Sequence, residues 1–230
     1  MKRNLSSVIS KMVVVAVLSA LGIGLMQIKI PYFIPWINID PSDTVILVSY
    51  AITGFWGSLS VALIKTLIDF FISGTGIYGI GQISAFIASM SYVGGLFLFS
   101  HVLKMFRKGL VRRIVSYVMI SLIVAVIMTA ANAIFITPTY INGAGWDSCF
   151  NSDTVNKIVQ AFGQYGNSYF IIIFVIYFPF NLIKGAFVCA LYELLFNRVI
   201  FVTFKDNEII KKYFSRNKSK ETNGSIEDNK

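Results

Sequence analysis

A lysine and an asparagine interrupt one of the most apolar stretches of the chain, the segment FPFNLIKG from Phe178 to Gly185. Lys184 carries three N–H donors and a positive charge, and Asn181 can both donate and accept hydrogen bonds. Three residues separate them, so both lie on the same face of a helix. Within a membrane, an ionisable side chain costs about 2.5 to 3.5 kcal/mol on insertion scales. The pair therefore predicts a polar ligand site; the alternative is a lysine that extends to the membrane surface.

Other polar residues lie at the ends of further apolar segments. Asp40 and Asp43, in INIDPSD, precede one such segment, where Asp43 is suited to cap a helix and ligand contact is the alternative. Asn132 lies inside another, and a buried amide there requires hydrogen-bond partners from a neighbouring helix or from a ligand. Tyr140 follows, among aromatic residues that suit an interfacial belt or a planar ligand. Asp40, Asn132 and Tyr140 therefore join the first pair as candidate ligand contacts.

Two further spacings suit contacts between helices. Lys65 and Asp69 are four residues apart, which allows an ion pair on one helix face. We interpret them as a structural pair or as a contact to a partner subunit. Ala16 and Ala20, in AVLSA, form a small-xxx-small pattern that lets another helix approach closely. This face of the first apolar helix serves either internal packing or the docking of another subunit.

No pattern in the sequence assembles a catalytic centre. GTGIYG, from Gly74 to Gly79, fits G-x-G-x-x-G but lacks the preceding strand that a dinucleotide site requires. The sequence contains no Walker A motif, no H-E-x-x-H and no G-x-S-x-G, and His101 is its single histidine. Cys149 and Cys189 have no metal-ligand spacing, and we interpret both as incidental thiols. We therefore expect a protein that is not an enzyme and that holds no metal or cofactor.

The composition places the chain among integral membrane proteins, because 56% of its 230 residues are hydrophobic and only 13% are charged. A helix needs about 20 predominantly apolar residues to cross the hydrocarbon core of a bilayer. Apolar runs of suitable length recur at 12–28, 44–72, 83–103, 114–136 and 169–204. These runs predict one membrane domain of about half a dozen helices.

The formal net charge of +9 is distributed as a membrane topology requires, which argues against a nucleic-acid site. Basic residues gather near the start, in one short connection and near the end. They are Lys2, Arg3 and Lys11, then Lys104, Arg107, Lys108, Arg112 and Arg113, and finally Lys205, Lys211, Lys212, Arg216, Lys218, Lys220 and Lys230. By the positive-inside rule, both termini and the 104–113 loop are predicted to be cytoplasmic. Segments 29–43 and 138–167, with one lysine each, are predicted to face outside.

Termini on the same side require an even number of spans, and we predict six. GFWGS, which starts at Gly54, divides the 44–72 run. Pro179 is expected to begin the last helix, because proline suits a first helical turn and disrupts a helix interior. The residues before Pro179 then form a shorter outside or interfacial helix. The predicted spans are about 10–29, 43–54, 57–72, 82–104, 112–137 and 179–203. A rival count keeps 44–64 as one span and adds 168–178 to another.

These predictions define the fold class as an all-α integral membrane protein. Six transmembrane helices form a compact bundle with an outward-facing ligand pocket, in the cell (plasma) membrane. Residues 1–205 form this single domain. Residues 206–230 are rich in Lys, Asn, Ser and Glu, so they are predicted to form a disordered basic cytoplasmic tail.

Five segments resemble, in order and spacing, the riboflavin-binding S components of energy-coupling factor (ECF) vitamin transporters. They are INIDPSD before the second span, GSLSVALIK in the third, GIGQISAFIAS opening the fourth, N followed by PTY ending the fifth, and FPFNLIKG opening the sixth. The resemblance covers about residues 10–203.

The resemblance implies a six-helix subunit that captures riboflavin from outside, as a transported ligand and not as a cofactor. It implies partners as well, a transmembrane coupling subunit with two cytoplasmic ATPase subunits that supply the energy. Asn132, Asn181 and Lys184 match polar positions of the family's ligand pocket, and Ala16 and Ala20 match the face that meets the coupling subunit.

Two other functions stay open at this point. An S component for another small vitamin or precursor would share the fold but not the pocket. A stand-alone secondary transporter would use Lys65 and Asp69 as an ion relay. A membrane enzyme is disfavoured because the sequence lacks catalytic groups.

Overall fold

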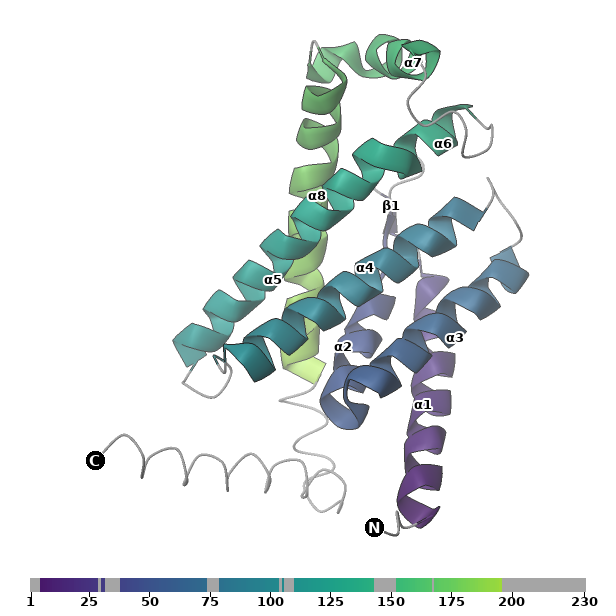
Figure 1. The fold of residues 1–230 in the computed structure, drawn as a ribbon, viewed down its shortest axis with the longest axis vertical. Helices are drawn as coiled ribbons and strands as arrows, with labels where there is room; N and C mark the ends of the chain where they lie inside the picture. The colour runs from purple at the N-terminus through teal and green to yellow at the C-terminus, as the bar shows by residue number, and fades with distance from the viewer. Residues whose placement is uncertain are drawn as a thin grey trace.

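The computed structural model describes residues 5–28, 30–31, 38–73, 79–103, 105, 110–142, 152–166 and 168–195. Nearly all of these residues are helical, and one short hairpin is the exception (Figure 1). The helices are α1 (Leu5–Met26), α2 (Ser42–Thr53), α3 (Phe55–Ser73), α4 (Ile80–Phe97), α5 (Leu110–Ala131), α6 (Thr137–Asn142), α7 (Ser152–Phe162) and α8 (Tyr169–Glu193). Strands β1 (Ile30–Pro31) and β2 (Asn38–Ile39) pair antiparallel, with Ile30 opposite Ile39. The predicted tail, 206–230, lies outside the described residues.

Five helices are long and apolar enough to cross a membrane: Val8–Met26, Phe55–Ser73, Ile80–Val102, Val111–Ile141 and Tyr169–Glu193. The predicted six spans correspond to these five and to α2, which is apolar but has only 12 residues. In Figure 1, α1, α3 and α5 run toward the end of the bundle that carries α7, whereas α2, α4 and α8 run back. The first turn of α1 and the last turn of α8 therefore lie at the same end. The chain is a multi-pass membrane protein.

The predicted break at GFWGS is confirmed. Gly54 separates α2 from α3 and has a positive φ of 82°, a backbone conformation that favours glycine. Its N–H donates to the carbonyl of Tyr50 at 3.0 Å, and its own carbonyl accepts from the N–H of Ser58 at 3.0 Å. A single residue thus ends one helix and begins the next, so α2 and α3 return side by side.

The predicted start of the last helix at Pro179 is wrong. α8 begins at Tyr169, and Pro179 lies inside it. Residues 169–178 were expected in a separate outside helix, but they continue the last one, as the rival count had it. Packing explains this outcome, because Tyr169 and Tyr177 are buried on this part of α8 and hold it in place although the proline lacks an N–H donor. Residue 203, the predicted end, lies outside the described residues.

The helix that starts at α5 also extends further than predicted. α5 continues without a break through a π-helical turn, Asn132–Ile136, into α6. A π-helical turn is a frequent feature of functional sites, because it inserts an extra residue and redirects the side chains around it. α4 likewise ends in a π-helical segment, Leu98–Val102.

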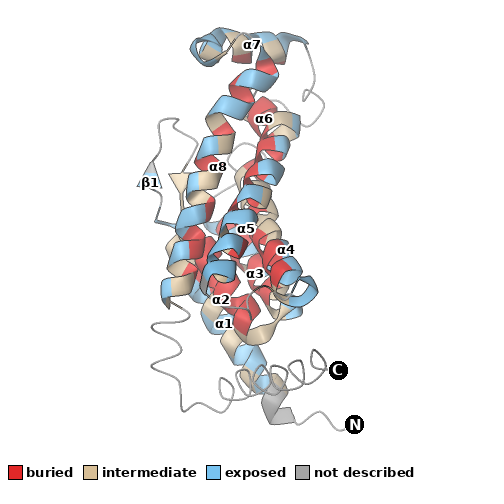
Figure 2. Cartoon of the chain, turned by 90° about the vertical axis from the view of Figure 1, so that its left-hand side faces the viewer, coloured by how far each residue is buried: buried red, intermediate tan, exposed pale blue. Residues whose placement is uncertain are grey.

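Buried residues gather where α2, α3, α4, α5 and α8 meet, and exposed ones cover the outward faces (Figure 2). α5 and α8 approach each other closely at Gly185. A Cβ atom added to Gly185 would lie 2.9 Å from Cβ and 3.0 Å from Cα of Ser121. The absence of a side chain at Gly185 therefore lets the two helices pack together.

A second apolar cluster lies toward the α7 end. Ile158 of α7 is fully buried against Tyr169, Ile172 and Tyr177 of α8. Ile39 of β2 packs against the same cluster. The strongly amphipathic α7 lies across this end of the bundle (Figure 1) and packs against the N-terminal half of α8.

Replacing Gly185 by valine should force α5 and α8 apart and lower the free energy of unfolding by about 1 to 3 kcal/mol, because the contact on Ser121 is partly to backbone. Ala186→Val is the matched control, since Ala186 is exposed on the same turn. Denaturant titration of both variants in mixed micelles measures the difference. Equal stability of the two variants would contradict a tight α5–α8 contact.

Candidate functional site

Lys184, in the middle of α8, contacts two carboxylates that flank the start of α2. Its Nζ lies 3.3 Å from Oδ2 of Asp40 and 3.2 Å from Oδ2 of Asp43. The side chain of Lys184 is only 12% exposed. An ion pair thus joins Lys184 to Asp40, which lies 144 positions earlier in the sequence. The alternative that Lys184 extends freely to the membrane surface does not describe this structure.

Asp43 connects Lys184 to a second lysine on α3. Lys65 is fully buried, and its Nζ lies 3.2 Å from Oδ1 of Asp43. The ammonium also donates to the hydroxyls of Ser42, at 2.9 Å, and Ser89, at 3.1 Å. The Ser89 hydroxyl in turn donates to Asp43 Oδ1 at 2.7 Å. All three donors of Lys65 therefore have partners.

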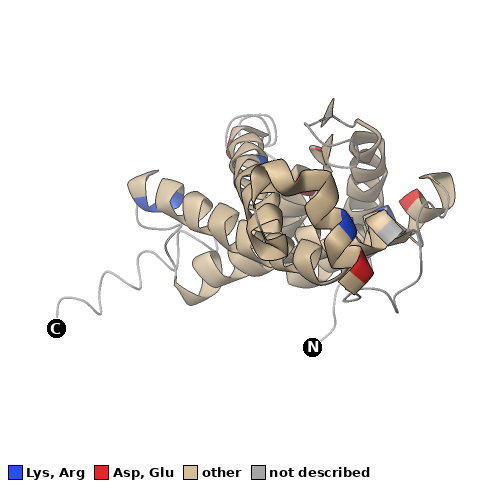
Figure 3. Cartoon of the chain, turned by 90° about the horizontal axis from the view of Figure 1, so that it is seen from above, with Lys and Arg blue, Asp and Glu red and all other residues tan. Residues whose placement is uncertain are grey.

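The four charged residues form what we call the ion-pair cluster: Asp40, Asp43, Lys65 and Lys184. Its two positive and two negative charges sum to zero. Burying a charge away from water is costly unless it is paired and hydrogen-bonded, and the cluster meets both conditions. The cluster links α2, α3 and α8, and Ser89 adds α4. Charged residues are otherwise sparse on the helices, as the view from above shows (Figure 3).

Two predictions for these residues are wrong. Lys65 and Asp69 were interpreted as a structural pair on one helix or as a contact to a partner subunit, but Lys65 pairs with Asp43 of α2. Asp69 instead accepts hydrogen bonds from Gln27 at 3.1 Å, Ser73 at 2.8 Å and Gln82 at 2.8 Å. Tertiary packing decides this outcome, because α2 brings a carboxylate closer to Lys65 than its own helix does.

Asp43 was also expected to cap α2, but it lies within the first turn and pairs with lysines. Asp40 takes the expected place at the helix start. Its Oδ1 accepts from the backbone N–H of Ser42 at 3.1 Å and from the Ser42 hydroxyl. The same carboxylate contacts Lys184 through its other oxygen. Asp40 therefore fixes the beginning of α2 and neutralises part of the charge on α8.

The two candidate asparagines lie on facing parts of α5 and α8. Asn132 opens the π-helical turn, where its Nδ2 donates to the carbonyl of Met128 at 2.7 Å. The Thr137 hydroxyl lies 3.4 Å from Oδ1 of Asn132 and 2.8 Å from the hydroxyl of Tyr177 on α8. Tyr169 donates to the carbonyl of Ala133 in the same turn. The π-helical turn is thus anchored to the N-terminal half of α8.

Asn181 lies one turn before Lys184 on α8 and is almost completely buried. Its Nδ2 donates to the carbonyl of Tyr177 at 2.8 Å. Within the described part of the chain, its Oδ1 accepts no hydrogen bond. Lys184 directs two contacts to carboxylates, which leaves one of its three N–H donors. An acceptor on Asn181 and a donor on Lys184 can therefore bond a ligand without breaking the cluster.

Tyr140 lies farther from these residues along the bundle, on α6. A Cβ atom added to Gly81 at the start of α4 would lie 3.2 Å from its hydroxyl oxygen. The structure thus brings Asp40 and Lys184 into contact, with Asn181 one turn away. It joins Asn132 to α8 through Thr137 and Tyr177, and it places Tyr140 at the contact between α6 and α4.

Sequence reasoning missed Ser42, Ser89, Thr137 and Tyr177 as members of the site. Serine and threonine occur throughout apolar helices and bond to their own backbone, as Ser91 and Ser121 do here. Their local sequences contain no signal that separates the two roles. Ala16 and Ala20 are exposed on α1, so neither takes part in packing within the described chain.

Removing Lys65 leaves the ion-pair cluster with two carboxylates and one lysine, hence with one buried negative charge that is not compensated. Lys65→Met should therefore lower the free energy of unfolding by about 3 to 5 kcal/mol. Adding Asp43→Asn removes the excess negative charge and leaves Lys184 paired with Asp40, so the double variant should lose less stability than the sum of the two single variants. A double-mutant cycle from denaturant unfolding tests the coupling, and additive losses would contradict it.

Comparison with known proteins agrees with this architecture. The riboflavin transporter FmnP of Bacillus subtilis (strain 168) is 27% identical over 197 residues, which cover 82% of this chain and 90% of FmnP. A solved structure of the S component of a bacterial ECF transporter superposes with a TM-score of 0.61 and covers 83% of this chain and 95% of that one. At 21% identity, this second likeness concerns the fold.

The family described as "ECF transporter, substrate-specific component" matches residues 10–196. The matched range runs from α1 to the end of α8 and includes every residue of the ion-pair cluster. Because the match covers most of the chain, this protein belongs to the family of substrate-specific components of ECF transporters.

Proposed function

We propose that this protein is the riboflavin-binding S component of an ATP-driven ECF uptake transporter. The observation that carries the proposal is the polar face of α8, where Lys184 keeps one donor and Asn181 keeps one acceptor within an apolar bundle. The similarity to a riboflavin transporter supports the choice of ligand.

The chemistry of riboflavin suits this face. Its ring system is planar and uncharged, and its polar edge alternates carbonyl acceptors with an N–H donor. Lys184 can donate to such a carbonyl, and Asn181 can accept from the N–H. The ion-pair cluster has no net charge, so a neutral ligand meets no unbalanced field. Asn132, Tyr140 and Asp40 complete the proposed contacts.

We propose that the α7 end of the bundle faces outside and that both termini are cytoplasmic. The basic residues of the 104–113 connection and of the two termini support this orientation. α2 is the sixth span in this proposal. It is short because it needs only to reach from the ion-pair cluster to Gly54. Riboflavin would then enter from the outside toward Lys184.

The proposed partners are a transmembrane coupling subunit and two cytoplasmic ATPase subunits. Ala16 and Ala20 are exposed on α1, next to exposed Val13 and Val17. Small residues four apart on an exposed apolar helix allow a second helix to pack closely. This face of α1 is the proposed contact with the coupling subunit.

The ion relay of a stand-alone secondary transporter loses its basis, because Lys65 pairs with Asp43 and Asp69 bonds to neutral groups. An S component for another vitamin remains the natural competitor, since the fold alone does not select the ligand.

Purified protein should be yellow and should quench riboflavin fluorescence in a titration. Lys184→Met should weaken binding about 10- to 100-fold, which corresponds to the loss of one hydrogen bond to a charged group. Lys11→Met is the matched control, because Lys11 is exposed on α1. Colourless protein that binds no riboflavin would contradict the proposal, and a thermal-shift screen against other vitamins would then identify the ligand.

Replacing Ala16 and Ala20 together by leucine should block the coupling subunit and leave riboflavin binding unchanged. Ala186→Leu together with Ala190→Leu is the control, because both residues are exposed on α8. Co-purification with the coupling subunit and the ATPases measures the effect. An unchanged yield of the complex would rule out this face of α1.

A further inference from the structure

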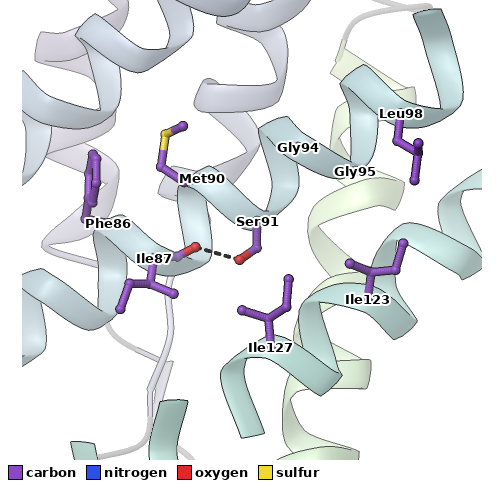
Figure 4. Close-up of a pocket in the computed structure, with 9 residues that line it drawn as sticks. All are labelled: Phe86, Ile87, Met90, Ser91, Gly94, Gly95, Leu98, Ile123 and Ile127. Atoms are coloured by element: carbon purple, nitrogen blue, oxygen red, sulfur yellow. Dashed lines mark hydrogen bonds between the residues drawn. The ribbon is translucent and has the colours of Figure 1, made fainter. Parts of the chain in front are cut away.

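An open groove of about 390 Å³ runs between α4 and α5, away from the ion-pair cluster. Ile123 and Ile127 of α5 point toward α4, and Ser91 and Leu98 point back from α4 (Figure 4). None of the predicted ligand contacts lines it. The groove is therefore a feature separate from the proposed riboflavin site.

The lining of the groove is apolar. Ser91 is its single hydroxyl, and that group donates to the carbonyl of Ile87 at 2.7 Å. A Cβ atom added to Gly94 would have no neighbour within 4 Å, so the groove is empty at this point. Such a lining suits an apolar ligand, which needs no hydrogen-bond partners. It does not satisfy the polar edge of a flavin, whose buried donors and acceptors need partners.

The groove lies within two candidate membrane spans, Ile80–Val102 and Val111–Ile141. Its open side is therefore covered by whatever contacts these spans in a bilayer. A single acyl chain is thin and flexible, and it is the commonest apolar group in contact with such spans, so it suits an open apolar groove on their surface.

A positively charged side chain, that of Arg112, lies on the face of α5 that lines the groove. Arg112 precedes Ile123 by 11 residues, which is about three turns and places both on one helix face, roughly 16 Å apart along the axis. Met119, which is 38% exposed, lies on this face between them. The separation is about half of the ~30 Å hydrocarbon core. It therefore matches the distance from a phosphate at the membrane surface to the far end of its acyl chain, near the bilayer midplane.

Arg112 is available for a phosphate. It is exposed, and it forms no ion pair with any residue that the structure describes. The adjacent Arg113 differs, because its guanidinium lies 3.3 Å from the carboxylate of Glu193. Arg112 thus lies near the start of α5, at one end of the apolar face formed by Met119 and Ile123, and its charge is unpaired among the described residues.

We propose that α4 and α5 bind one anionic phospholipid. One acyl chain fills the groove beside Gly94, Ile123 and Ile127, extends along Met119, and places the phosphate against the guanidinium of Arg112. The site is independent of the riboflavin proposal, since it uses another face of the bundle and another class of ligand.

Native mass spectrometry of the purified protein tests the acyl-chain groove. The probes are phosphatidylglycerol and phosphatidylcholine with identical acyl chains, added in equal amounts. Gly94→Leu fills the groove and should abolish the tightly bound lipid. Gly24→Leu is the matched control, because a Cβ atom there also has no neighbour within 4 Å but lies on α1. Thermal unfolding confirms that both variants are folded.

The headgroup contact is tested in parallel. The wild-type protein should retain phosphatidylglycerol over phosphatidylcholine, and Arg112→Gln should weaken phosphatidylglycerol binding about fivefold without changing phosphatidylcholine binding. Lys11→Gln, at another exposed basic position, should have no effect.

Three results would overturn the proposal. The first is equal lipid retention by Gly94→Leu and Gly24→Leu. The second is no preference for the anionic lipid in the wild-type protein. The third is a Gly94→Leu variant that keeps its lipid but no longer co-purifies with the coupling subunit, which would assign the groove to a partner helix.

Discussion

The structure depends on the compensation of charge inside an apolar bundle. Lys65 is fully buried and the side chain of Lys184 is only 12% exposed, so water cannot fully solvate either ammonium. Asp43 lies between them and contacts both at 3.2 Å, while Asp40 supplies the second negative charge. Each group of the cluster is therefore paired by a residue from another part of the chain, and the helices that carry these residues cannot move independently.

This requirement connects the fold to the site. α2 places Asp43 between α3 and α8, and Gly54 returns the chain directly into α3, so Lys65 reaches the same carboxylate. Gly185 follows Lys184 and lets α8 approach α5, which continues into the π-helical turn that begins at Asn132. The residues that stabilise the bundle are thus neighbours of those proposed to bind the ligand. The cost of burying charge is balanced within the protein, and the cluster presents no net charge to the neutral ligand that we propose.

Two kinds of surface follow from the same arrangement. Polar groups turn inward, where Asn181 and Lys184 keep one free acceptor and one free donor. Apolar groups turn outward along α1, α5 and α8, where membrane and partner subunits are the available neighbours. On α1 this surface carries small residues suited to a helix, whereas between α4 and α5 it is hollow and suited to an acyl chain. A substrate-specific component needs both kinds of surface, since it binds its substrate and works within a membrane complex.

The sequence by itself determined the membrane class, the position of most helices, the break at Gly54 and the presence of two polar side chains, Lys184 and Asn181, on one face of an apolar helix. Hydrophobic runs, charge distribution and glycine conformation are local properties, so a linear reading detects them. Only the tertiary structure decided which charges pair. Lys65 had a carboxylate four residues away, yet α2 supplies a closer one. It also decided that α8 continues through Pro179, because the packing of Tyr169 and Tyr177 outweighs the hydrogen bond that proline cannot donate. Pairing and packing depend on distances between remote segments, and no local pattern encodes those distances.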